Sequence, residues 1–278
     1  INQVNYKSSN LTDISPLADC LNLPVYCGRT STTNAIIHTL SLSDNQLQDW
    51  PHQQAYNQGK RIDVHNRLDL QDNADLENLL IFEGSFQSPD WTCYYNNIYD
   101  YADFRNTAVS NTADSLGVCK NWIRCKRIFL DNSENFTSMS AMFNNNNLQY
   151  TRQDYIDHQT FYYVELNHTS VNDLSWLVHP PAAGIVYLKC SYTDVDIDTI
   201  NAVKDQIVAL KQAGEMKLQY IYLSYTPLDD KLADGTYAKC SGTDFSQYTK
   251  FKKEFLDVGI HVQLSRSGLG GWTSLPSC

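Results

Sequence analysis

Three stretches in the second half of the chain share one eleven-residue pattern: FYYVELNHTSV at residues 161–171, IVYLKCSYTDV at 185–195 and LQYIYLSYTPL at 218–228. Apolar residues occupy positions 1, 4, 6 and 11 of each stretch, and threonine stands at position 9 every time. This spacing is typical of a short strand that ends in a turn, with the side chains at positions 4 and 6 facing a core. A pattern that recurs in this way indicates a repeat architecture.

A fourth copy lies near the start of the chain, where the five marked positions are occupied by Ile37, Leu40, Leu42, Asn45 and Leu47. The frame resembles the leucine-rich repeat, whose consensus is Leu-x-x-Leu-x-Leu-x-x-Asn-x-Leu. The family resemblance covers most of residues 35–270 and includes the asparagine of the consensus in this copy.

Weaker copies lie between and after the good ones, at residues 125–133 and 259–269. Two further frames, 68–73 and 76–86, lie too close together in the chain for both to be repeats, so one of them is wrong. The steps between the good copies are uneven, with 24 residues from Phe161 to Ile185 and 33 from Ile185 to Leu218.

Patterns typical of helices lie in the longer segments between one copy of the repeat and the next. Apolar residues recur at helical spacing from Ile200 to Leu210, before Lys211 and Gly214, and again from Phe245 to Phe255. Alternation of strands and helices requires a parallel sheet, so the chain is expected to be α/β. The resemblance implies a leucine-rich-repeat-like solenoid with helices on the convex side. A single α/β domain with a parallel sheet is the alternative.

At 278 residues, the chain is long enough for one full core, and no segment has the composition of a linker. We therefore expect a single domain, 1–278. The resemblance implies that residues 1–34 form an N-terminal cap and residues 265–278 a C-terminal cap, because end repeats otherwise expose their core.

The formal net charge of −10 argues against a nucleic-acid surface, which needs clustered Lys and Arg. No apolar run approaches the roughly eighteen residues of a membrane-spanning helix. The spacings typical of zinc sites, Cys-x-x-Cys and His-Glu-x-x-His, are missing, as is a Gly-x-Ser-x-Gly elbow. We expect no cofactor.

Two features favour an extracellular location. The chain has eight cysteines, and it has three Asn-x-Ser/Thr acceptors for glycosylation, at Asn10, Asn135 and Asn167. Together they are typical of a secreted protein or of a receptor ectodomain.

The resemblance also suggests which cysteines form disulfides. Cys20 and Cys27 lie where the N-terminal caps of leucine-rich-repeat ectodomains are closed by a disulfide, and Cys240 with Cys278 is placed to close the other end. Cys93 and Cys119 then remain as a pair flanking an insertion. Cys125 and Cys190 are expected to be buried apolar residues.

One acidic cluster, Asp194, Asp196 and Asp198, follows directly on an expected strand. The carboxyl ends of parallel strands are where catalytic carboxylates collect. The structural alternative is that Asp196 or Asp198 caps the helix that begins near Thr199.

The repeat register makes the sharper functional prediction. Positions 3, 5, 7 and 8 point outward, and equal positions of neighbouring parallel strands lie side by side. The outward residues expected to bind a ligand are Tyr163, Glu165, Tyr187, Lys189, Tyr192, Tyr220, Tyr222 and Tyr225. Tyrosine is a good strand former, so such rows can be purely structural, but it is also favoured at protein-binding surfaces. Asn167, an expected glycosylation site, falls at outward position 7.

The sequence thus favours an extracellular recognition module that binds another extracellular protein or a glycoconjugate through a Tyr-rich concave sheet face, without catalysis. The competing interpretation is a secreted α/β hydrolase that acts on glycans with the cluster Asp194–Asp198. Such an enzyme needs a second carboxylate or a histidine about 5–10 Å from the first.

Overall fold

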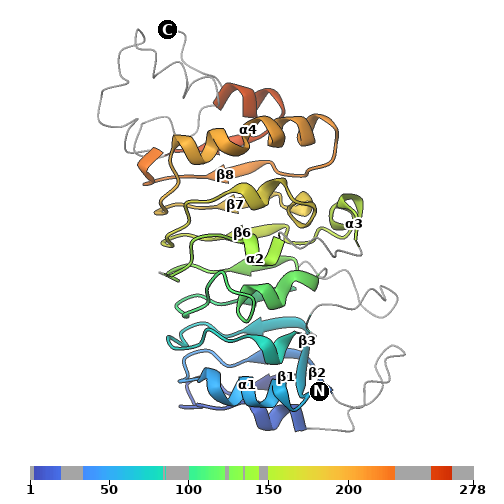
Figure 1. Cartoon of the computed structure of the whole chain (residues 1–278), viewed down its shortest axis with the longest axis vertical. Coiled ribbons are helices and arrows are strands. Elements are labelled where there is room, and N and C mark those ends of the chain that lie inside the picture. Colours follow the sequence, from blue (N-terminus) through green and yellow to red (C-terminus); the bar gives the residue numbers. More distant parts are fainter. Residues whose placement is uncertain are drawn as a thin grey trace.

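The computed structural model describes residues 3–19, 34–83, 85, 100–122, 125–133, 135–143, 150–228 and 252–264. Within these residues, nine parallel strands form one sheet, and their order in the sheet is their order in the chain. The strands are β1 (Gln3–Asn5), β2 (Asn34–Ser41), β3 (Arg61–Asp69), β4 (Tyr101–Asp103), β5 (Arg127–Phe129), β6 (Tyr163–Glu165), β7 (Tyr187–Lys189), β8 (Tyr220–Tyr222) and β9 (His261–Gln263). Figure 1 shows the strands stacked along the long axis of the molecule. The prediction of an α/β chain with a parallel sheet is confirmed, and the alternative of a single α/β domain fits it.

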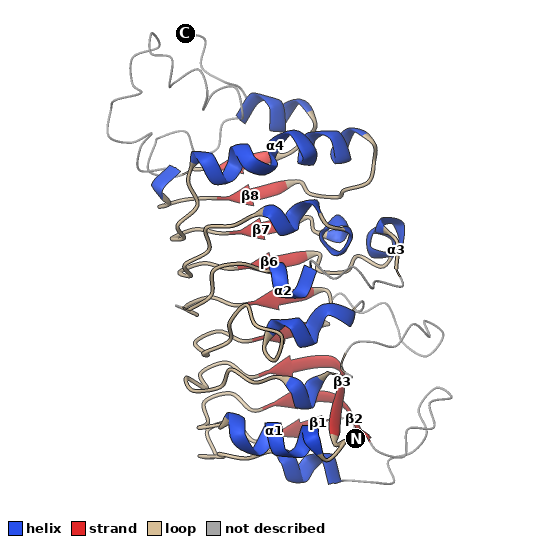
Figure 2. Ribbon diagram, in the orientation of Figure 1, coloured by secondary structure: helices blue, strands red, loops and turns tan. Residues whose placement is uncertain are grey.

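Helical segments lie between successive strands and, in the view of Figure 2, on one side of the sheet. The α-helices are α1 (Asp49–Asn57), α2 (Ser140–Phe143), α3 (Arg152–Asp157) and α4 (Ile197–Gln212). The 3-10 segments are η1 (Ser15–Asp19), η2 (Leu80–Phe82), η4 (Leu116–Asn121), η5 (Ser175–Val178) and η6 (Pro180–Gly184). None of the helices in the described part of the chain is long and apolar enough to cross a membrane.

The helix expected after β7 is confirmed as α4. Asp196 is its N-cap, with the side chain accepting a hydrogen bond from the backbone N–H of Thr199 at 2.8 Å. Ile200, Val203 and Ile207 form its buried face. The predicted helix from Phe245 to Phe255 falls mostly outside the described residues.

The middle residue of each short strand faces the core. Val164, Leu188 and Ile221 are at most 1% exposed, whereas the residues on either side of them are only partly buried. Burying such a side chain contributes about 1.5–3 kcal/mol. These strand residues share one apolar cluster with residues from the helical side such as Trp176 and Ile200, so each repeat adds one layer to a continuous core.

Each of the first eight strands is followed by the same turn. The third residue after the end of each of these strands has a positive φ, between 52° and 61°. These left-handed residues are Ser8, Asp44, Asp72, Asn106, Asn132, His168, Tyr192 and Tyr225. Asn, Asp and His adopt this conformation more readily than other side chains, and tyrosine does so rarely.

The next residue in each turn explains the recurrent threonine. The Thr169, Thr193 and Thr226 hydroxyls donate to the carbonyl oxygens three residues earlier, at 2.7, 2.7 and 2.9 Å. Asn45 and Asn73 make the same bond from their side-chain amides, at 2.8 and 2.9 Å. Threonine and asparagine therefore make the same bond at this position of the turn.

Asparagine does more at this position, because its larger amide also reaches the adjacent repeat. The Asn73 amide donates to the carbonyl of Leu42 at 3.0 Å, and its oxygen accepts from the Leu47 N–H at 3.2 Å. The shorter threonine side chains of Thr169, Thr193 and Thr226 donate within their own turns.

Some expected repeats need correction. Of the two competing frames, 68–73 matches the strand-and-turn pattern, because Leu68 lies in β3 and Asn73 in the turn after it. The frame at 76–86 is wrong where it is described: Leu76, Leu79 and Ile81 are buried, but they lie in and beside the 3-10 segment η2.

Two strands were not expected at all, namely β1 and β4. The strand β1 lies within residues 1–34, which were predicted as a cap, and it pairs with β2 as a member of the sheet. Residues 20–33 and the predicted C-terminal cap, 265–278, lie outside the described residues.

Candidate functional site

The sheet register brings the predicted tyrosines together. Tyr163 pairs with Tyr187, and Tyr187 with Tyr220, so the three form one row across β6, β7 and β8. The predicted second row, Glu165, Lys189 and Tyr222, is formed by the same pairing two residues further along each strand. We refer to the outward residues of β5–β9 and of the turns after β6–β8 as the Tyr-rich face.

Stacking organises the first row. The Tyr187 and Tyr220 rings are 4.9 Å apart at an interplanar angle of 4°, and the row continues to His261 at 5.4 Å and 20°. Rings stacked in this way cover each other's faces. They therefore turn ring edges and phenol hydroxyl groups toward solvent, which suits hydrogen bonding more than it suits stacking of a further ring.

A parallel row follows the turns. His168 stacks on Tyr192 at 4.1 Å and 12°, and Tyr192 stacks on Tyr225 at 4.6 Å and 10°. Tyr192 and Tyr225 are 46% and 39% exposed, which makes them two of the most exposed large aromatic side chains in the described part of the chain. The predicted position-8 residues thus lie side by side at the edge of the Tyr-rich face.

Charged residues of the second row are held by neighbours. Glu165 accepts hydrogen bonds from the Tyr163 hydroxyl at 2.7 Å and from the Asn167 amide at 2.8 Å, and it lies 3.5 Å from the Lys189 ammonium. Burial and the bond to Glu165 raise the pKa of Tyr163, so its phenol stays protonated and acts as a donor.

Asp131, in the turn after β5, lies beside Glu165. Burial, the negative charge of Glu165 and a side-chain hydrogen bond with it raise the pKa of Asp131 to about 7, although the Asn167 N–H donates to its carboxylate at 2.7 Å. Asp131 therefore keeps its proton up to about neutral pH. This pair was not predicted. Asp131 lies at outward position 7, but in a copy of the repeat that matches the pattern only weakly.

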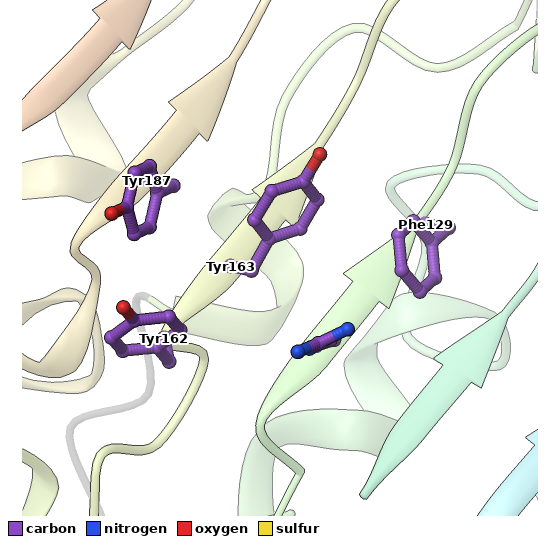
Figure 3. A pocket seen from close by; sticks show the side chains of 5 residues that line it. Phe129, Tyr162, Tyr163 and Tyr187 are labelled. Carbon is purple, nitrogen blue, oxygen red and sulfur yellow. The ribbon is translucent and has the colours of Figure 1, made fainter. Parts of the chain in front are cut away.

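A pocket opens next to the first row, with a volume of about 330 Å³. It is lined by Arg127 and Phe129 of β5, Tyr162 and Tyr163 at β6, and Tyr187 of β7. Figure 3 shows the Tyr162 and Tyr187 hydroxyl groups on one side of the pocket and Phe129 on the other. Arg127 and Phe129 were not predicted as site residues, although they occupy outward positions 3 and 5 of the weak copy at 125–133.

The acidic cluster does not converge. The Asp196 carboxylate caps α4, as the structural alternative predicted, and its oxygen also accepts from the Thr199 hydroxyl at 2.8 Å. Asp194 and Asp198 are exposed. In the part of the chain that the structure describes, no group of three or more His, Cys, Asp or Glu residues is arranged to hold a metal ion.

The predicted glycosylation sites differ in their surroundings. Asn10 and Asn135 are exposed. Asn167 is half-buried, and its side chain is bonded on both sides: the amide donates to Glu165, and the oxygen accepts from the Ser191 N–H at 2.9 Å. Asn167 is therefore part of the polar network of the Tyr-rich face.

Three cysteines are described, and all three are buried free thiols: Cys119, Cys125 and Cys190. Burial raises the pKa of each thiol, so all three stay protonated. This agrees with the expectation for Cys125 and Cys190, but it does not support the predicted pairing of Cys119. Its expected partner Cys93 lies outside the described residues, as do Cys20, Cys27, Cys240 and Cys278.

Comparisons of the chain with protein-family models, curated proteins and solved structures found no match.

Proposed function

We propose that this chain is an extracellular recognition module, a leucine-rich-repeat-like solenoid that binds another protein through the Tyr-rich face. The extracellular part of the proposal rests on the eight cysteines and on the three glycosylation acceptors. The solenoid rests on the consecutive parallel strands and on the shared turn after each of the first eight.

The observation that carries the binding proposal is the pair of stacked aromatic rows. Tyr187, Tyr220 and His261 form one row, and His168, Tyr192 and Tyr225 form the other. Rings held by their neighbours lose little further side-chain freedom when a partner binds. Their edges and hydroxyl groups combine apolar contact area with polar tips, a combination that is favoured at binding hot spots.

The hydrolase interpretation has weaker support. Of the three predicted acids, Asp196 is engaged as a helix cap. Glu165 accepts from the Tyr163 hydroxyl and the Asn167 amide, and Asp131 accepts from the Asn167 N–H, so both carboxyl groups are engaged within the protein. The bond from the Asn167 N–H to Asp131 instead holds the turn after β6 in place.

The proposal is tested by a binding screen of the glycosylated chain against a library of extracellular proteins. The test variant combines Tyr187→Ala, Tyr220→Ala and Tyr222→Ala. Trp50→Ala is the matched control, because Trp50 is 73% exposed and lies on α1, away from the Tyr-rich face.

We expect a partner whose affinity falls at least about thirtyfold in the triple variant, the loss of one hot spot of about 2 kcal/mol, and is unchanged in the control. Circular dichroism checks that both variants fold. A partner that binds the triple variant as tightly as the native chain would refute recognition through this face.

A further inference from the structure

The pocket at β5–β7 differs chemically from the stacked rows beside it. Its rings are inclined to one another, with Phe129 and Tyr163 at 51° and Tyr163 and Tyr187 at 40°. Inclined rings leave parts of their faces open, whereas the parallel rings of Tyr187 and Tyr220 cover each other. The pocket therefore exposes the faces of aromatic rings to a ligand, whereas the stacked rows do not.

Arg127 gives the pocket a positive charge that no acidic residue of the described part of the chain pairs with. Among the described residues, its guanidinium forms no ion pair and no hydrogen bond, although other cations of the same sheet face do. Arg67 lies 3.8 Å from Asp69, Arg105 lies 2.6 Å from Asp103, and Lys189 lies 3.5 Å from Glu165.

The nearby acids are already engaged and do not satisfy Arg127. Glu165 is bonded to Tyr163, Asn167 and Lys189, and Asp131 accepts from the Asn167 N–H at 2.7 Å. A partly buried guanidinium in an aromatic pocket is a strong, bidentate binder of carboxylates. The pocket thus pairs one open anion site with an apolar wall.

The surroundings favour a single negative charge over a double one. Glu165 lies on the neighbouring strand, and the whole chain carries a net charge of −10. A phosphate dianion leaves one charge uncompensated beside these acids, whereas a carboxylate is balanced by Arg127 alone. The volume, about 330 Å³, is at the lower end of the range for ligand pockets and suits one or two side chains.

We propose that this pocket receives an acidic side chain of the protein partner, a Glu or Asp next to an apolar residue, with the carboxylate on Arg127 and the apolar group against Phe129, Tyr163 and Tyr187. This inference rests on the proposed function and names the chemistry that the partner presents to one part of the Tyr-rich face. Tyr162, whose ring lies 5.4 Å from that of Tyr187, forms the rim.

The test uses two blocked tripeptides, acetyl-Phe-Glu-Phe-amide and its neutral counterpart acetyl-Phe-Gln-Phe-amide, titrated by calorimetry into the native chain and its variants. Arg127→Gln removes the charge, and Arg127→Lys keeps the charge but loses the bidentate geometry. Arg67→Gln is the matched control, because Arg67 lies in the same row on β3.

We expect the Glu peptide to bind the native chain and the Arg67→Gln control equally, and to bind Arg127→Gln at least about tenfold more weakly. The affinity of Arg127→Lys for the Glu peptide should lie between those of the native chain and of Arg127→Gln. The Gln peptide should bind the native chain about tenfold more weakly than the Glu peptide. Because the described structure gives the Arg127 side chain no bond to lose, the variants should fold as the native chain does, which circular dichroism checks.

Equal binding of the two peptides, equal binding by Arg127→Gln, or no binding of the Glu peptide overturns the inference. Displacement of the Glu peptide by inorganic phosphate at a lower concentration than by acetate also overturns it, in favour of a phosphorylated ligand. Failure of this inference can be told apart from failure of the proposed function, because Tyr220 and Tyr222 do not line the pocket. The variants Tyr220→Ala and Tyr222→Ala should still bind the Glu peptide but should lose affinity for the protein partner.

Discussion

Tyr192 combines two opposing effects that substitution can separate. Its φ of 59° is left-handed, which costs a residue with a Cβ about 1–2 kcal/mol. Its ring is stacked between His168 at 4.1 Å and Tyr225 at 4.6 Å, and each such pair contributes about 0.5–1.5 kcal/mol. The stacks therefore offset the backbone strain.

Tyr192→Ala removes both stacks and keeps the strain, so we expect it to destabilise the fold by about 1–3 kcal/mol. Tyr192→Gly also removes the stacks but relieves the strain. Glycine also lowers the free energy of unfolding by about 0.4–1 kcal/mol, because it gives the unfolded chain more conformational freedom, and this offsets part of the relieved strain. The glycine variant should thus be more stable than the alanine variant by about 0.5–1 kcal/mol.

Ser191, the preceding residue, is the control, because it is not among the left-handed residues. There the order should reverse, with Ser191→Gly less stable than Ser191→Ala by about 0.5–1 kcal/mol. The assay is urea unfolding followed by far-UV circular dichroism, with midpoints and slopes compared. Alanine more stable than glycine at both positions would contradict the account of the turn.

Three further substitutions test other parts of the structure by the same unfolding assay. Thr193→Val removes the buried bond to the Cys190 carbonyl and should cost about 1 kcal/mol; an unchanged midpoint would show that this bond does not hold the turn. Gly184→Ala places a Cβ against the Thr160 carbonyl oxygen and should cost about 2–3 kcal/mol, whereas a neutral result would mean that the backbone there moves freely. Asp131 keeps a proton in the folded chain that the unfolded chain releases, so its contribution to stability is present below about pH 4 and is lost as pH rises through about 7. Asp131→Asn should therefore gain about 1–2 kcal/mol relative to the native chain between pH 5 and pH 8, after allowing for solvent screening, and a pH-independent difference would be the contrary result.

The repeat frame predicted the strands whose middle residue is a large aliphatic side chain. Leu40, Ile128, Val164 and Leu188 mark such strands, because a fully buried strand position needs an apolar group that fills the core. The strand β4 was not predicted. Its buried middle residue is Ala102, and the pattern of large apolar residues does not distinguish an alanine in a strand from one in a loop.

Apolar spacing alone also produced one false repeat. Leu76, Leu79 and Ile81 are as buried as any strand residue, yet they belong to the helical side of the core. Nothing in the spacing of three apolar residues tells a strand from a 3-10 segment. The polar residue of the turn is the better signal, because Asn73 makes the hydrogen bond that identifies the true repeat.

The sequence predicted those parts of the candidate site that depend on the register of the strands. Equal positions of parallel strands lie side by side, so the Tyr163–Tyr187–Tyr220 row followed from the three best copies. The pocket was not predictable, because Tyr162 lies just before its strand and because its place beside Tyr187 depends on the path of the chain between η6 and β7.

The measurement that tests the central claim most directly places a glycan on the Tyr-rich face. Tyr222→Asn creates an Asn-Leu-Ser acceptor on β8 with the Leu223 and Ser224 already present, and Tyr222→Gln is the matched variant without a glycan. We predict that the glycosylated variant binds the partner found in the screen at least about tenfold more weakly than Tyr222→Gln, because a bulky glycan covers the proposed contact surface. Equal affinity of the two variants, with the glycan confirmed by mass spectrometry, would contradict recognition through this face.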